Sequence, residues 1–155
     1  MKQKVLILIA IAVVLTFAVS SFALAEEVEE NTIETQETGG DRSSNYLNAY
    51  SAEITGQGSN TMRVSFGVYA TRVMNKVGVV QIIIEKNAGN GWAYDRTLYH
   101  NSYPNFIRLN AIQNVSSVTF SGVKNYRYRV TITAYAADST GFDYKLAYSG
   151  SAICY

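Results

Sequence analysis

The stretch TMRVSFGVYAT, residues 61–71, decides the fold class of this chain. Its apolar side chains recur at every second position, while polar residues, Gly67 and Tyr69 fill the positions between them. Alternation over such a run indicates a half-buried antiparallel strand. The stretch YRYRVTITAYA, residues 126–136, alternates in the same way and predicts a second strand of this kind.

Further strand-like segments lie around these two and are separated by turn signals rich in Gly, Asn, Asp and Ser. We expect strands over residues 46–55, 61–71, 79–86, 92–99, 106–112, 115–121, 126–136 and 142–149. The single proline, Pro104, falls in a loop between two of them. No segment has helical periodicity. This pattern predicts an all-β domain, an immunoglobulin/fibronectin-III-like two-sheet antiparallel sandwich of about seven or eight strands, with a small closed barrel as the open alternative.

The first 25 residues have the parts of a secretory signal peptide: two lysines, an apolar run over residues 5–19, and an A-x-A site ending at Ala25. We expect cleavage between Ala25 and Glu26, which leaves 155 − 25 = 130 residues. The alternative is an uncleaved anchor, but the run is shorter than the roughly 20 residues that span a bilayer. We therefore expect a secreted, extracellular protein that meets the membrane only transiently, through its signal peptide.

Charge divides the mature chain into two parts. Residues 26–45 carry seven acidic side chains and one arginine, a net charge of 1 − 7 = −6, and we expect a disordered linker there. Residues 46–155 carry ten basic and five acidic side chains, a net charge of 10 − 5 = +5, and form the predicted β-domain. The linker is either a solubilising spacer or a segment that folds back over a basic surface. No run rich in Lys and Arg exists, so we expect no nucleic-acid partner.

Residues for catalysis or metal binding are in short supply. His100 is the only histidine and Cys154 the only cysteine, so a zinc site or a catalytic triad lacks its companions. Asp138 and Asp143 are the only near pair of domain carboxylates; we interpret them as parts of a hairpin turn, with a calcium loop as the alternative. We expect no enzyme activity and no cofactor.

Cys154 has two interpretations. It is either a partly buried small apolar residue of a final strand or turn, or a thiol that forms an intermolecular disulfide. A monomer is favoured, and a disulfide-linked dimer through Cys154 is the alternative.

The function that these observations leave open is binding of a partner through one face of a β-sheet. On the strand at residues 126–136, Arg127, Arg129 and Tyr135 are predicted to point outward among threonines. They form either an ordinary solvated face or a platform for an anionic polymer, such as a cell-wall phosphate polymer, through charge-assisted hydrogen bonds.

The strand at residues 92–99 offers a second candidate. Trp92 and Tyr94 alternate there with Arg96 and Leu98, which predicts that all four share one face. Trp92 is interpreted either as a plug in the core or, with Tyr94, as an aromatic surface on which a sugar stacks.

Two resemblances bear on the fold. The segment GVKNYRYRV, residues 122–130, is similar to the turn and strand of fibronectin type III domains in which a tyrosine hydroxyl ties down the preceding loop. The resemblance implies this role for Tyr126.

Residues 46–155 also resemble a family of small secreted proteins of Gram-positive bacteria, catalogued as a domain of unknown function. The resemblance rests on FGVYATRVM at 66–74, VG at 77–78, GW at 91–92, YR at 126–127, the turn at 136–141 and Asp143. It implies an exported bacterial protein with an immunoglobulin-like sandwich, and no activity. The terminal Cys154-Tyr155 departs from the family pattern.

Together these observations predict a non-enzymatic extracellular module that binds cell-envelope polymers, glycans or a protein. The alternative is a diffusible secreted effector or inhibitor that acts on another protein.

Overall fold

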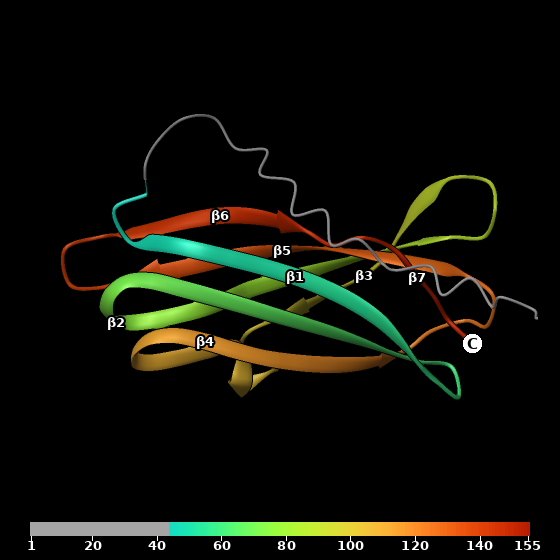
Figure 1. Ribbon diagram of the computed structural model, residues 1–155, viewed down its shortest axis with the longest axis horizontal. Helices are drawn as coiled ribbons and strands as arrows, with labels where there is room; N and C mark the ends of the chain where they lie inside the picture. The colour runs from blue at the N-terminus through green and yellow to red at the C-terminus, as the bar shows by residue number, and fades with distance from the viewer. Residues whose placement is uncertain (1–43) are drawn as a thin grey trace, which may run out of the picture. The chain divides into compact units, whose positions relative to one another are not determined.

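The computed structural model describes residues 44–155, which form an all-β, antiparallel structure (Figure 1). The predicted signal peptide, its cleavage site and the linker up to residue 43 lie outside the described residues. Seven strands belong to one hydrogen-bonded sheet. The strands are β1 Leu47–Gly58, β2 Thr61–Asn87, β3 Trp92–Tyr99, β4 Ile107–Ser121, β5 Arg127–Ala137, β6 Phe142–Tyr148 and β7 Ala152–Ile153, with a 3-10 turn η1 at Pro104–Phe106. Within residues 44–155 there is no helix with the length and hydrophobicity needed to cross a membrane.

Strand β2 organises the sheet because it pairs with four other strands. Its first half pairs with β1 on one edge and with the second half of β4 on the other. Its second half pairs with β3 and β5. In Figure 1, β2 turns back beside its label and β4 follows it round the same end of the domain. Each half of β2 therefore lies in a different part of the folded sheet.

The bend in β2 coincides with irregular pairing. The register with β4 shifts between Tyr69 and Met74, and the register with β5 shifts between Val79 and Gln81. Extra residues on one strand of a pair bend that strand and increase its twist, as β-bulges do. The expected division into strands at 61–71 and 79–86 is therefore wrong, because β2 continues through the bend and its pairing with β4 resumes at Met74. For the same reason the expected strands at 106–112 and 115–121 are one strand, β4.

The core lies between the two parts of the folded sheet. The alternation predicted for residues 61–71 and 126–136 is confirmed, since Val64, Phe66 and Val68 of β2 and Val130 and Ile132 of β5 are buried. Strand β1 lies against β5 and β6 without a hydrogen-bonded ladder between them, so it packs across the core. The all-β antiparallel class is confirmed; the two-sheet sandwich, with its immunoglobulin or fibronectin type III character, stays a prediction.

Gly78 allows the closest backbone approach in the bend. Its φ is +150°, and a Cβ built there would lie 1.9 Å from the carbonyl oxygen of Phe106 and 2.7 Å from Nδ2 of Asn114. The Asn114 amide in turn donates to the Phe106 carbonyl at 2.8 Å. A side chain at residue 78 would separate β2 from the start of β4, so glycine is required here.

The tyrosine that ties down the loop before β5 is Tyr128, not Tyr126. The Tyr128 hydroxyl accepts a hydrogen bond from the backbone N–H of Val123 at 2.9 Å, and the whole side chain is buried. Its ring meets Phe120 edge-on at a centroid distance of 5.5 Å. Tyr126, two residues earlier, is partly buried against the core. Tyr126 and Tyr128 are two residues apart, so the alternating pattern points both side chains inward. The path of the preceding loop brings the Val123 N–H to the hydroxyl of Tyr128.

Replacing Tyr128 with phenylalanine tests this tie. The Tyr128→Phe variant leaves the Val123 N–H without its partner while preserving the ring packing, so we expect a loss of about 1–2 kcal/mol in the free energy of unfolding. Urea unfolding followed by circular dichroism measures it. Tyr148→Phe, at an exposed position of β6, is the matched control and should change stability by less than about 0.5 kcal/mol. Equal stabilities of the two variants would contradict the assigned role.

Candidate functional site

The outward surface of β6, β5, the second half of β2 and β3 carries an unusual number of aromatic side chains. Register places these residues on one side of the sheet, because their neighbours Ala147, Ile132, Ile82 and Leu98 point into the core. We call this surface the aromatic face. Its aromatic and aliphatic members are Trp92, Tyr94, Tyr99, Tyr135, Phe142, Tyr144, Leu146 and Tyr148.

Cross-strand rows show how the aromatic face is built. In one row Leu146 of β6 pairs with Thr133 of β5, and Thr133 pairs with Gln81 of β2. Gln81 then pairs with Tyr99 of β3, and its amide donates to the Thr133 hydroxyl at 3.3 Å. Hydroxyl and amide groups therefore lie between the rings, so the face combines apolar surface with hydrogen-bonding groups.

Four of the five sequence-predicted binding residues meet at one end of the aromatic face. Tyr94 and Arg129 flank Glu85, while Trp92 and Arg127 flank Asn87. Tyr135, the fifth, lies eight residues along β5 from Arg127, about 26 Å at ~3.3 Å per residue. The outward direction predicted for Arg127, Arg129 and Tyr135 agrees with this register.

The predicted common face of Trp92, Tyr94, Arg96 and Leu98 is wrong beyond Tyr94. The register of β2 with β3 shifts there, from Glu85 opposite Tyr94 to Ile84 opposite Arg96. A bulge at Asp95 therefore turns Arg96 and Leu98 to the opposite side of β3. Leu98 is buried there, while Arg96 stays exposed with its guanidinium 5.5 Å from the Phe120 ring centroid. The bulged Asp95 pairs with Lys86 at 2.9 Å and with Arg96 at 2.6 Å.

Trp92 is a surface residue, and its interpretation as a core plug is wrong. It is only partly buried and does not belong to the core cluster. The guanidinium of Arg129 lies 4.5 Å from its ring centroid, within the range of a cation–π contact. Arg129 also forms two hydrogen bonds to Glu85, at 2.8 and 3.3 Å. Because this carboxylate neutralises Arg129 and Trp92 covers it, Arg129 is poorly placed to bind an external anion.

The opposite end of the aromatic face holds a cluster that sequence reasoning missed. Tyr135 and Tyr144 are stacked with centroids 5.0 Å apart, and Phe142 meets Tyr144 at 5.2 Å. Both Phe142 and Tyr144 are more than half exposed. The signal was present, since FDYKLAY at 142–148 alternates with aromatic and apolar residues on one side. That side faces solvent because the intervening Ala147 is the residue that enters the core.

A pocket opens beside this cluster. It has a volume of about 180 Å³ and is lined by Lys76, Val80, His100, Ile107, Tyr135 and Tyr144; we call it the tyrosine pocket. His100, the only histidine of the sequence, donates its backbone N–H to the carbonyl of Val80 at 3.1 Å. Partial burial and the neighbouring Tyr144 raise the pKa of Tyr135, so its hydroxyl keeps its proton and remains a donor.

The outward surface of β1, the first half of β2 and β4 is different in kind. Small polar side chains dominate the rows there, among them Ser51, Thr55, Ser65, Ser117 and Thr119. Among the outward-facing residues in the ladders of this surface, the aromatic one is Tyr69. It is 38 % exposed, and its ring lies over Gly67. The aromatic residues of the domain surface are therefore concentrated on one half of the folded sheet.

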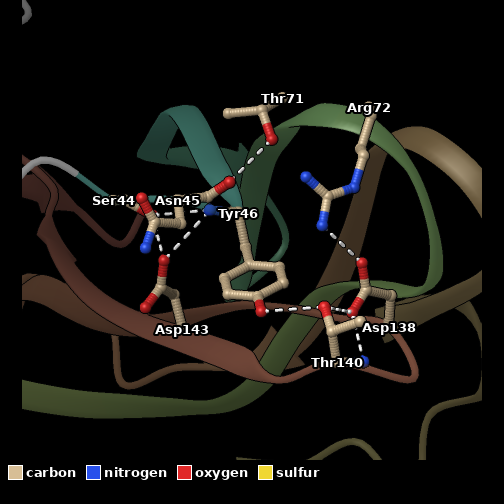
Figure 2. Close-up of polar contacts among 8 residues, drawn as sticks. All are labelled: Ser44, Asn45, Tyr46, Thr71, Arg72, Asp138, Thr140 and Asp143. Atoms are coloured by element: carbon tan, nitrogen blue, oxygen red, sulfur yellow. Dashed lines mark hydrogen bonds and ion pairs between the residues drawn. The ribbon is translucent and has the colours of Figure 1, made fainter.

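Asp138 and Asp143 hold the start of the domain against the β5–β6 turn (Figure 2). Asp143 accepts hydrogen bonds from the Ser44 hydroxyl and from the Tyr46 backbone N–H, the latter at 3.1 Å. Ser44, which was expected to belong to the linker, therefore contacts the domain. Asp138 accepts the Thr140 backbone N–H and hydroxyl through one carboxylate oxygen, at 2.7 and 2.6 Å.

The second carboxylate oxygen of Asp138 pairs with Nη2 of Arg72 at 2.7 Å. The bonds from Thr140 and Arg72 hold the pKa of Asp138 well below its usual range. The two carboxylates thus have internal partners, which agrees with the hairpin interpretation. Among residues 44–155 no three His, Cys, Asp or Glu side chains gather closely enough to hold a metal ion.

Cys154 is fully buried. Its backbone N–H donates to the carbonyl of Tyr126 at 3.0 Å, and its own carbonyl accepts the N–H of Asn125 at 2.7 Å. The thiol lies against Gly122, where an added Cβ would stand 2.9 Å from Sγ. An intermolecular disulfide would require this C-terminal segment to open first.

No protein-family model matches this chain, and no curated protein matches it in sequence. The resemblance to the Gram-positive family, the absence of enzyme activity and the secreted location therefore stay predictions.

Removing the Trp92 side chain separates its surface position from the core interpretation. Because Trp92 is partly exposed and contacts Arg129, we expect Trp92→Ala to lower the free energy of unfolding by about 1 kcal/mol. A core tryptophan would cost about 3–5 kcal/mol. Chemical unfolding measures the difference, with Phe106→Ala, at a fully buried position, as the reference for core loss. Equal losses in the two variants would restore the core interpretation.

We call the contacts of Asp138 with Arg72 and Thr140 the clamp. The low pKa of Asp138 predicts that the clamp weakens in acid. The charged carboxylate contributes stability above its unfolded pKa of about 3.9, and this contribution disappears as pH falls toward the lower folded pKa. Between about pH 5 and about pH 2, the stability of the wild-type protein should therefore decline more than that of Asp138→Asn. Urea unfolding at several pH values tests this, and Glu53→Gln, at an exposed carboxylate of β1, is the control. Parallel pH profiles for wild type and Asp138→Asn would exclude the clamp.

Proposed function

We propose that this protein is a secreted, non-enzymatic binding module that binds a glycan of the cell envelope through its aromatic face. The observation that carries the proposal is the concentration of exposed rings on one half of the sheet, including Tyr94 at 65 % and Tyr144 at 52 % exposure. Exposed aromatic clusters are costly in water unless a partner covers them, so they mark interaction surfaces.

The chemistry of the face favours a sugar polymer as the partner. Of the eight residues that define the aromatic face, five are tyrosines and one is a tryptophan, so six carry a hydroxyl or an indole N–H at the end of an apolar ring. Threonine hydroxyls lie between them. Sugar rings present an apolar C–H face for stacking and a rim of hydroxyls for hydrogen bonds, which matches this combination.

The shape of the face points the same way. The rings lie along about 26 Å of β5, from the Trp92 end to the Tyr135 end, rather than round a single deep cleft. An extended polymer can contact several rings in sequence, with a modest contribution from each. A platform of arginines for an anionic polymer is weakened as an explanation, because Glu85 already neutralises Arg129.

Co-sedimentation with washed cell walls and with purified wall polysaccharide tests the function. We expect retention of the wild-type protein and about fivefold weaker binding for Tyr144→Ala, since one lost aromatic stacking contact is worth about 1 kcal/mol. Tyr69→Ala is the matched control: it removes a tyrosine from the opposite outward surface and should leave retention unchanged. Circular dichroism confirms that both variants remain folded.

Two outcomes would contradict the proposal. Wild-type protein that stays in the supernatant would exclude wall binding and favour a diffusible effector that acts on another protein. Equal losses for Tyr144→Ala and Tyr69→Ala would show that the aromatic face is not the binding surface.

A further inference from the structure

The tyrosine pocket combines a stacked aromatic wall with a lysine side chain. Tyr144 and Tyr135 form the wall, and Lys76 and His100 belong to the lining. Its volume of about 180 Å³ is many times the ~10–15 Å³ that one water molecule needs, so a small ligand can enter it.

The charges around the pocket favour an anion. Of the basic side chains in residues 44–155, Arg72, Lys86, Arg96 and Arg129 pair with carboxylates. Lys76 forms none of these ion pairs and is exposed. No carboxylate belongs to the pocket lining, so an anion placed there meets Lys76 without competition.

The position of the pocket is set by the fold rather than by chance surface packing. Lys76 and Val80 flank Gly78, which pairs with Tyr135 of β5 in the ladder. Ile107 comes from the β4 strand that pairs with Gly78 on its other edge. The pocket thus lies over the bend of β2, where the tight backbone approach holds its walls in place.

We infer that the tyrosine pocket is a subsite for an anionic sugar residue, whose ring stacks on Tyr144 while its carboxylate or phosphate pairs with Lys76. This inference rests on the proposed function, since the pocket forms one end of the aromatic face. It adds a selectivity: acidic sugars bind more tightly than neutral ones at this position.

Titration of the purified protein with glucuronate, glucose 6-phosphate and glucose, followed by NMR, tests the subsite. We expect both anionic sugars to shift the Tyr135 and Tyr144 signals with about fivefold lower Kd than glucose, the upper range for one exposed ion pair. Added salt should reduce this preference. The carboxylate and phosphate arms show which anion the pocket accepts.

Lys76→Gln should abolish the preference, while Lys124→Gln, at an exposed cation in the loop before β5, should leave the preference intact. Inorganic phosphate alone should bind more weakly than glucose 6-phosphate, because it cannot stack on Tyr144. Phosphate that binds as well as the phosphosugar would overturn the subsite.

The failures are distinguishable. Equal affinity for anionic and neutral sugars, or a preference that survives Lys76→Gln, would overturn the anionic subsite and leave glycan binding in place. If no sugar perturbs Tyr135 or Tyr144 and the walls do not retain the protein, both the subsite and the proposed function are wrong.

Discussion

The pairing of β2 with four other strands depends on one close backbone contact. Where β2 bends, Gly78 lies against the Phe106 carbonyl at a separation that no side chain would permit. The side-chain amide of Asn114, buried beside Gly78, donates a hydrogen bond to the same carbonyl. The Phe106 carbonyl therefore has a hydrogen-bond partner in the bend. Strand β4 pairs with β2 both before the bend and within it. Each of these two strands therefore passes from one part of the folded sheet into the other. Without the bend, β1 and β5 could not face each other across a common core.

The same bend has a consequence for the surface. It separates the outward surface of β1, β2 and β4, lined by Ser and Thr, from the aromatic face on the other half. Ordinary domain surfaces carry scattered apolar residues, but a concentration of exposed aromatic rings on one half of the sheet calls for a partner. At one end of that face Glu85 pairs with Arg129, and the neighbouring Arg127 contacts the Ser151 hydroxyl. At the other end Lys76 is exposed. Both ends therefore combine aromatic rings with a cationic side chain.

Several features of the fold could be read from local sequence, because they depend on alternation alone. Val64, Phe66, Val130 and Ile132 are buried as period-two patterns predict. The predictions of side-chain direction and role were wrong where a bulge added a residue to a strand or where the path of a loop decided the contact. One bulged residue at Asp95 reversed the direction of Arg96 and Leu98, and alternation carries no signal for such an insertion. Tyr126 and Tyr128 have equivalent places in the pattern, and only the path of the loop brings Val123 to the Tyr128 hydroxyl.

What the sequence by itself determined is the all-β class, the set of side chains that enter the core along its clearest strands, and the outward direction of Arg127, Arg129 and Tyr135. These follow from side-chain alternation, which each strand carries within its own residues. Only the tertiary structure decided that residues 61–87 form one bent strand, and that Tyr99 and Tyr144 share a face with Tyr135. The physical reason is that these relations depend on register between segments distant in the chain. That register is set by bulges and by contacts such as the one at Gly78, which no local pattern records.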